Sequence, residues 1–124
     1  MQPAIFRPEE KNENYTEEGC HILELSNSPV DEALSVARAR VETGVTTRFH
    51  RLAKTAERYV VLSGTGRVEV GDLAATEVAA GDVVLIPPGI EQRISNTGNE
   101  DLVFLALCTP RFRQENYQDT QGED

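Results

Sequence analysis

Short segments rich in branched aliphatic residues recur about every ten residues along the middle of this chain, with turn-forming residues between them. The segments are CHILEL, ALSVARARV, TTRFHRL, RYVVLSG, GRVEVG, ATEVAAG, DVVLIPPG, QRISNTG and LVFLALCT. Glycine, proline, asparagine and serine mark the turns, as in Ser63–Gly66 and Pro87–Gly89. Roughly eight short antiparallel strands are typical of a β-sandwich, jelly roll or small barrel. The pattern therefore predicts an all-β fold.

The segment Asp31–Glu42 (DEALSVARARVE) is the one stretch with a competing helical interpretation. Its alanine and arginine content favours a helix. Its central part, SVARARV, alternates as a strand does. We expect a strand here.

The charge balance of the chain limits its partners. A length of 124 residues fits one domain, so any function has to reside in one pocket or on one surface. Acidic residues outnumber basic ones, 21 against 12, and the formal net charge is −9. A field of this sign repels phosphate backbones and anionic lipid surfaces. We therefore expect neither nucleic acid nor a membrane as a partner.

Features of the N-terminus and of the cysteines bear on the cellular compartment. The first residues, MQPAIFRPEEKNEN, lack the basic and then apolar order of a secretory signal, and no apolar run approaches the roughly 20 residues of a membrane span. Cys20 and Cys108 lie far apart and match no CxxC pattern. They are typical of small buried side chains in a reducing compartment rather than of a disulfide or a zinc site. We expect a cytoplasmic protein.

Both ends of the sequence are polar and differ from the middle. We expect an N-terminal arm at residues 1–19, a β-barrel domain at 20–109 and a C-terminal tail at 110–124. The apolar exceptions in the two ends are Phe6, Tyr15, Phe112 and Tyr117. Such anchors could pack onto the barrel or across a subunit boundary, and the edge strands of an open jelly roll need a cover. The sequence therefore predicts a homodimer.

Two blocks bounded by glycine carry the most specific pattern. They read GVTTRFHRLAKTAERYVVLSG from Gly44 and GDVVLIPPGIEQRISN from Gly81. The residues that stand at characteristic spacings are Gly44, His50, Glu57, Gly64, Gly81, Pro87, Gly89 and Asn96. In these positions the chain resembles the cupin superfamily, and specifically small single-domain cupins of the mannose-6-phosphate-isomerase-like type. The resemblance covers about residues 33 to 109 and implies a jelly-roll β-barrel of two antiparallel sheets.

The departures from the cupin pattern concern a metal site. Cupins usually hold a divalent metal with three histidines and a glutamate, and here Leu52 and Gln92 replace two of the histidines. The resemblance leaves His50 and Glu57 as standard ligands, with the carbonyl oxygen of Gln92 as a possible third. This mixed set would suit zinc, manganese, iron or nickel, but weakly. Dioxygenase chemistry is disfavoured because non-haem iron normally takes two histidines and one carboxylate.

Strand alternation predicts which other side chains share the pocket. Residues two apart in a strand share a face, so an inward His50 implies an inward Arg48. The same rule pairs Glu57 with Tyr59, and it places Asn96 on the face of Gln92. We expect Glu57 and Tyr59 to act on protons, and the substrate to contact Arg48, Tyr59 and Asn96.

A metal-free arrangement is the alternative for the same pocket. A buried Glu57 would then need a cationic partner, and Arg48 or protonated His50 could supply it. Such a pocket would still bind a small anion.

Two functions remain open from the sequence. The first is a metal-assisted isomerase or lyase that acts on a sugar, a sugar phosphate or a small carboxylate, with a proton moved by Glu57 or Tyr59. The second is a non-catalytic small-molecule-binding or accessory cupin with a degenerate site. Both imply a small-molecule ligand in the barrel.

Overall fold

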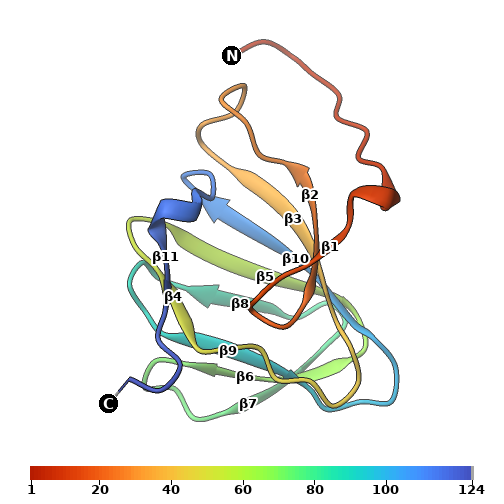
Figure 1. Ribbon diagram of the computed structural model, residues 1–124, viewed down its shortest axis with the longest axis vertical. Helices are drawn as coiled ribbons and strands as arrows, with labels where there is room; N and C mark the ends of the chain where they lie inside the picture. The colour runs from red at the N-terminus through yellow and green to blue at the C-terminus, as the bar shows by residue number, and fades with distance from the viewer. Residues whose placement is uncertain (124) are drawn as a thin grey trace.

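Two antiparallel sheets face each other and form a barrel (Figure 1). The computed structural model describes residues 1–123. The six-stranded sheet consists, in spatial order, of β1 (Asn14–Tyr15), β2 (His21–Ser26), β3 (Ser35–Val41), β10 (Leu102–Thr109), β5 (Ala56–Ser63) and β8 (Val83–Ile86). The five-stranded sheet consists of β11 (Tyr117–Asp119), β4 (His50–Leu52), β9 (Gln92–Asn96), β6 (Thr65–Val70) and β7 (Thr76–Ala79).

Helical structure within residues 1–123 is confined to two single turns. These are the 3₁₀ turns η1 (Glu10–Asn12) and η2 (Gln114–Asn116). No helix in the described part of the chain is long and apolar enough to cross a membrane. The all-β jelly roll predicted from the sequence is confirmed.

The segment with the competing helical interpretation forms β3. It pairs with β2 on one side and with β10 on the other. Ser35, Ala39 and Val41 face the interior and are buried, whereas Arg38 and Arg40 lie on the outer face. Tertiary pairing on both sides of the strand outweighs the helix propensity of alanine and arginine.

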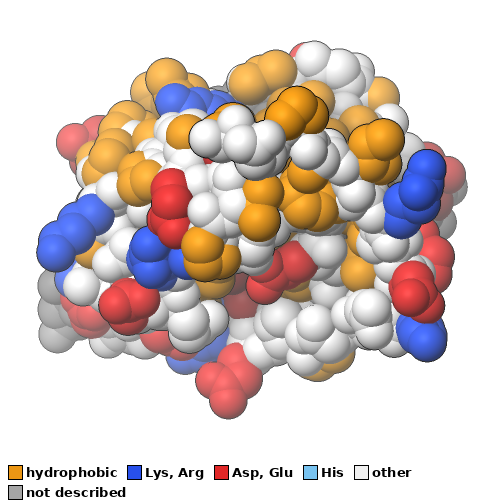
Figure 2. Space-filling view, turned by 90° about the horizontal axis from the view of Figure 1, so that it is seen from above, with side chains coloured by type: hydrophobic (Ala, Val, Ile, Leu, Met, Phe, Trp, Pro, Cys, Tyr) orange, Lys and Arg blue, Asp and Glu red, His pale blue; other side chains and the backbone are white. Residues whose placement is uncertain are grey.

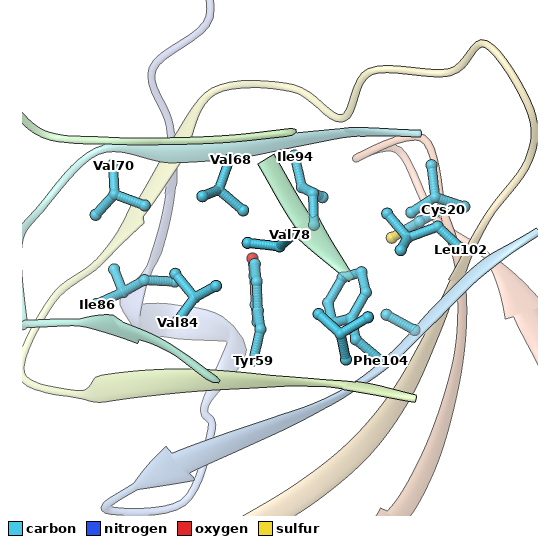
Figure 3. Close-up of a cluster of buried hydrophobic side chains, with 13 residues drawn as sticks. Cys20, Tyr59, Val68, Val70, Val78, Val84, Ile86, Ile94, Leu102 and Phe104 are labelled. Carbon is cyan, nitrogen blue, oxygen red and sulfur yellow. The ribbon is translucent and has the colours of Figure 1, made fainter. Parts of the chain in front are cut away.

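The apolar core fills one part of the barrel interior. Figure 3 shows aliphatic side chains from the two sheets meeting there, with Tyr59 rising from β5 toward the opposite sheet. The members that it labels include Val68, Val70, Val78, Val84, Ile86, Ile94, Leu102 and Phe104. Each such side chain contributes about 1.5–3 kcal/mol when it is fully buried. The rings of Tyr59 and Phe104, 4.4 Å apart between centroids, mark the edge of this core because they also line a cavity.

Gly64, which ends the first motif, is required by its surroundings. It follows β5 with a positive φ of 85°, a conformation that side chains rarely adopt. A Cβ atom here would also come within 2.6 Å of the backbone oxygen of Asp101. The tight joint between β5 and β6 therefore needs glycine.

Both polar ends pack partly against the barrel. The C-terminal segment adds β11 to the small sheet, where Asp119 pairs with His50. In the N-terminal arm the carboxylate of Glu13 lies 2.6 Å from Arg40 and 3.0 Å from Arg38. These contacts hold the arm across the outer face of β3.

Candidate functional site

A cavity of about 510 Å³ lies between the two sheets, next to the apolar core. Residues of β2, β3, β4, β5 and β10 line it, together with residues of both terminal segments. Its volume falls within the range of sites for small organic ligands. This cavity is the candidate functional site.

Glu57 forms part of the inner wall. It alternates inward from β5, and only 8% of its surface is exposed. Its Oε1 accepts a hydrogen bond of 2.8 Å from Nε2 of Gln92, and its Oε2 accepts one of 3.7 Å from the thiol of Cys108. Burial raises the pKa of Glu57 to about 7. This carboxyl group therefore changes its protonation state near neutral pH.

Tyr59 and Gln92 extend this arrangement as a chain of hydrogen bonds. The Tyr59 hydroxyl donates to Oε1 of Gln92, whose nitrogen donates to Glu57. Burial raises the pKa of Tyr59 well above its ordinary value, so its hydroxyl stays protonated. The donors in this chain of hydrogen bonds therefore all point the same way, from Tyr59 through Gln92 to Glu57, and the carboxylate accepts the last N–H.

His50 presents one open nitrogen to the cavity. The ring is 3% exposed, and its Nδ1 lies 2.9 Å from the backbone oxygen of Arg48. A carbonyl oxygen only accepts, so Nδ1 carries a hydrogen, and Nε2 is an acceptor whenever the ring carries no second proton. Nε2 is 3.7 Å from Oε1 of Glu18, and the Tyr117 ring stacks on the imidazole at 5.1 Å.

Glu18 and Tyr117 are site residues that the sequence reasoning missed. Glu18 is held by its own backbone oxygen, which accepts a hydrogen bond of 2.9 Å from the nitrogen of Arg48. Its carboxylate also accepts from the thiol of Cys20 at 3.5 Å. Both residues lie in segments predicted to be tails, and no spacing relates them to the motifs. The apolar anchors Phe112 and Tyr117 in the C-terminal segment were the only usable signal.

Two of the three predicted metal ligands, Glu57 and Gln92, are hydrogen-bonded to each other. Among residues 1–123, no group of three or more His, Cys, Asp or Glu side chains converges to hold a metal ion. Gln92 turns its amide nitrogen toward Glu57, and its oxygen already accepts from Tyr59. An amide N–H group is a donor and cannot ligate a cation. His50, Glu57 and Gln92 therefore do not fit the metal that the fold would suggest.

The structure contradicts the inward orientation expected for Arg48. Its side chain is 45% exposed and bonds Asp119 at 2.6 Å on the outside of the barrel. The strand begins only at His50, and in the irregular segment before it Thr47 is buried instead. The alternation rule does not extend across that segment, so Arg48 neither lines the cavity nor pairs with Glu57.

Asn96 is also outside the cavity. It is buried at the end of β9, where its Nδ2 donates to the backbone oxygens of Val41 and Glu100 at 2.9 and 2.8 Å. Its Oδ1 accepts from the nitrogen of Gly98 at 2.9 Å. All its polar atoms are used to fix the loop after β9, so a substrate-binding role does not fit this geometry.

The cysteines are both buried and free, as expected. Cys108 has a further part, because it lines the cavity and its thiol contacts Glu57. Burial raises the pKa of this thiol, so it remains a protonated donor.

Two antiparallel sheets that enclose a cavity define a small jelly-roll barrel. The family described as the Cupin domain matches residues 37–108, which is more than half of the chain. The chain belongs to the cupin family.

Two curated proteins match most of this chain in sequence, and a solved structure matches it in fold. An uncharacterized protein of Methanocaldococcus jannaschii is 32% identical over 103 residues, covering 82% of this chain and 82% of that protein. The oxalate decarboxylase OxdC of Bacillus subtilis is 29% identical over 94% of this chain, which spans 31% of the length of that enzyme. The nucleoside dehydratase Pac13 has a similar structure, with a TM-score of 0.77 and 16% identity over 95% of this chain and 92% of that one. Variants of the Streptomyces protein are known with uridine.

Proposed function

We propose that this cupin binds a small polar organic molecule in its barrel cavity and transfers a proton to or from it through Glu57. The observation that carries the proposal is the buried Glu57 carboxyl, which lines the cavity and has a pKa of about 7. The reaction class is isomerisation or elimination, in which proton transfer at carbon or oxygen is the central step.

The physical basis is the match between the pKa and neutral pH. A general acid or base works best when its pKa lies near the operating pH, and it then contributes typically about 10²–10⁴-fold to the rate. An ordinary glutamate with a pKa near 4.5 would be fully ionised at neutral pH and a weak base. Gln92 and Cys108 fix the carboxyl in position by donating to its two oxygens.

The relatives support this reaction class. Pac13 is described as a nucleoside dehydratase, and dehydration is an elimination; oxalate decarboxylase also removes a small molecule from its substrate, by cleaving a C–C bond. Uridine in the Pac13 variants indicates the ligand size that a barrel of this shape accommodates. The proposal includes no step through a metal, because Gln92 offers its donor nitrogen to the carboxylate.

The second candidate is a non-catalytic binder in the same cavity. Leu52, at the position of a motif histidine, lines the cavity and cannot act on a ligand chemically. This candidate shares the binding step with the first and differs only in turnover.

The test is a screen of sugars, amino sugars, polyols and hydroxy acids in D₂O, followed by proton NMR to detect elimination, isomerisation or exchange of carbon-bound hydrogen. We expect turnover of at least one compound by the wild type and a loss of about 100-fold or more in Glu57→Gln. Glu77→Gln, an exposed carboxylate on β7 that pairs with Arg67, is the matched control and keeps full activity. Equal turnover by Glu57→Gln would refute the role of Glu57, and binding without any turnover would establish the binder.

A further inference from the structure

We infer that the ligand of this cavity carries a protonated amine, which the open nitrogen of His50 and the carboxylate of Glu18 bind together. The inference rests on the proposed function of the same cavity and names the class of its ligand. It departs from the sugar phosphates and carboxylates expected from the sequence.

The first argument is the charge of the wall. The charged residues that line the cavity are Glu17, Glu18, Glu24 and Glu57, and no Lys or Arg lines it. Figure 2 looks down on the molecule and shows acidic side chains in the hollowed centre of that face, with Lys and Arg side chains to its sides. An anionic ligand would enter a field of its own sign, whereas a cation is attracted.

The arginines that could neutralise this wall are engaged elsewhere. Arg48 is on the outside with Asp119. Arg38 and Arg40 bind Glu10, Glu13 and Asp101 on the outer face of the large sheet. The negative charge of the cavity is therefore left for a ligand to balance.

The second argument is the unpartnered acceptor on His50. The side chain is almost fully buried, its Nδ1–H is used by a backbone carbonyl, and Nε2 has no hydrogen-bond partner. Oε1 of Glu18 lies 3.7 Å from this nitrogen, which is too far for a hydrogen bond but is ion-pair distance when the ring carries a proton. One ammonium group placed about 2.8 Å from each atom would donate to both.

The rest of the lining indicates the body of the ligand. The stacked Tyr117 and the ring of Phe112 offer flat apolar surface, and Ser35 and Gln114 offer polar groups. A hydroxylated amine such as an amino sugar or an amino alcohol satisfies both kinds of surface.

The test compares ligands that share a body and differ in charge. Glucosamine, glucose and glucuronate form one set, and ethanolamine, ethylene glycol and glycolate form another. Each is titrated into ¹⁵N-labelled protein at low ionic strength, and the shifts of backbone amides around the cavity give the affinity. We expect the amine of at least one set to bind about tenfold or more tightly than its acid. If no amine exceeds its matched acid by that factor, the inference is wrong.

Variants locate the amine. Glu18→Gln lowers the affinity for the amine by about tenfold and leaves that for the neutral compound unchanged. Glu77→Gln, which carries the same charge change outside the cavity, leaves both unchanged. Should Glu18→Gln be poorly folded, Glu24→Gln at the cavity wall gives a smaller loss in the same direction. An amine affinity unaffected by both cavity variants would overturn the assignment.

Failure of this inference and failure of the proposed function give different results. A preference for the acid, combined with turnover that depends on Glu57, would refute the amine and leave the proton transfer intact. A preference for the amine without turnover would support the amine and refute proton transfer.

Discussion

Nε2 of Gln92 lies 2.8 Å from Oε1 of Glu57, so the position where cupins usually carry a motif histidine here donates a hydrogen bond to the motif glutamate. In place of two metal ligands side by side, the pair forms a donor and an acceptor. The same amide accepts from Tyr59, which ties the hydroxyl, the amide and the carboxyl into one chain. Burial raises the pKa of Glu57, and this hydrogen bond from Gln92 opposes the rise by favouring the charged carboxylate.

Replacement of Gln92 by histidine is expected to restore metal binding. Gln92→His exchanges an amide that donates to Glu57 for a nitrogen ligand, next to His50 and Glu57. The affinity for zinc or manganese should rise by at least about tenfold, or roughly 1.4 kcal/mol, in calorimetric titration. His50→Ala in the same background removes the gain. A variant that binds no more tightly than the wild type would show that the remaining residues cannot approach a common ion.

Loss of the Tyr59 hydroxyl should destabilise the fold. Tyr59→Phe leaves the buried Oε1 of Gln92 without its donor, which costs about 1–3 kcal/mol. Urea denaturation measures the difference in the free energy of unfolding. Tyr15→Phe is the matched control, because Tyr15 is 63% exposed, and its stability should not change. Equal stability of the two variants would contradict the hydrogen-bond chain.

Stability should fall as the pH rises from about 4.5 to about 7 because of Glu57. Its pKa is raised from 4.5 to about 7 by burial, so in this window the native state holds a proton that the unfolded state has lost. The native state is therefore favoured at the acidic side, by up to roughly 3 kcal/mol, and this contribution is lost through the folded pKa. Glu57→Gln removes this component of the pH slope, as denaturation at pH 5 and 7.5 would show. Carboxylates with lowered pKa, such as Glu13 at about 2, lose their contribution only below this window.

Removal of the Arg48 side chain should leave ligand binding unchanged. Arg48→Ala breaks an exposed ion pair with Asp119, and the side chain that it removes does not line the cavity. Asp119→Ala, which breaks the same pair from the other side, should behave alike in ligand titrations. Weakened binding in Arg48→Ala alone would support the inward orientation predicted from strand alternation.

The homodimer expected from the sequence remains a prediction, but the structure offers a contact surface other than the two polar ends. Phe112 and Tyr117 are half-buried and line the cavity of their own chain, whereas Phe6, another of the apolar anchors, is 45% exposed. Leu62, Val83 and Leu85 are exposed on the outer face of the neighbouring strands β5 and β8. We expect a dimer mass in light scattering and a monomer after Val83→Lys with Leu85→Lys. A wild-type monomer at micromolar concentration would exclude this association.

The spacing within the motifs predicted the part of the site that lies on continuous strands. Glu57 and Tyr59 are two apart on β5, and the period of a strand brings both to the interior. The same rule was wrong for Arg48, because regular pairing begins only at His50. Asn96 was placed on the correct face, but bonds to three backbone groups, which no spacing reveals, remove it from the cavity.

The particular contacts between distant segments could not be predicted from the sequence, although the apolar anchors indicated that the ends could pack on the barrel. Glu18 reaches His50 because the backbone of the N-terminal arm bonds that of Arg48. Tyr117 reaches the same ring through the pairing of β11 with β4. Both depend on how the two ends of the chain fold back over the barrel, and local residue patterns do not encode that path.

The N-terminal and C-terminal segments both lie against the cavity, so their protection should depend on whether a ligand is bound. Thr16 and Glu18 on one side and Phe112 and Tyr117 on the other line the same cavity, so a molecule that fills it would contact both segments. A compound that fills the cavity would hold both segments closed and slow their cleavage by a protease, while the strands of the barrel stay resistant throughout. The rate at which a protease cleaves these two segments would therefore show whether the cavity is filled.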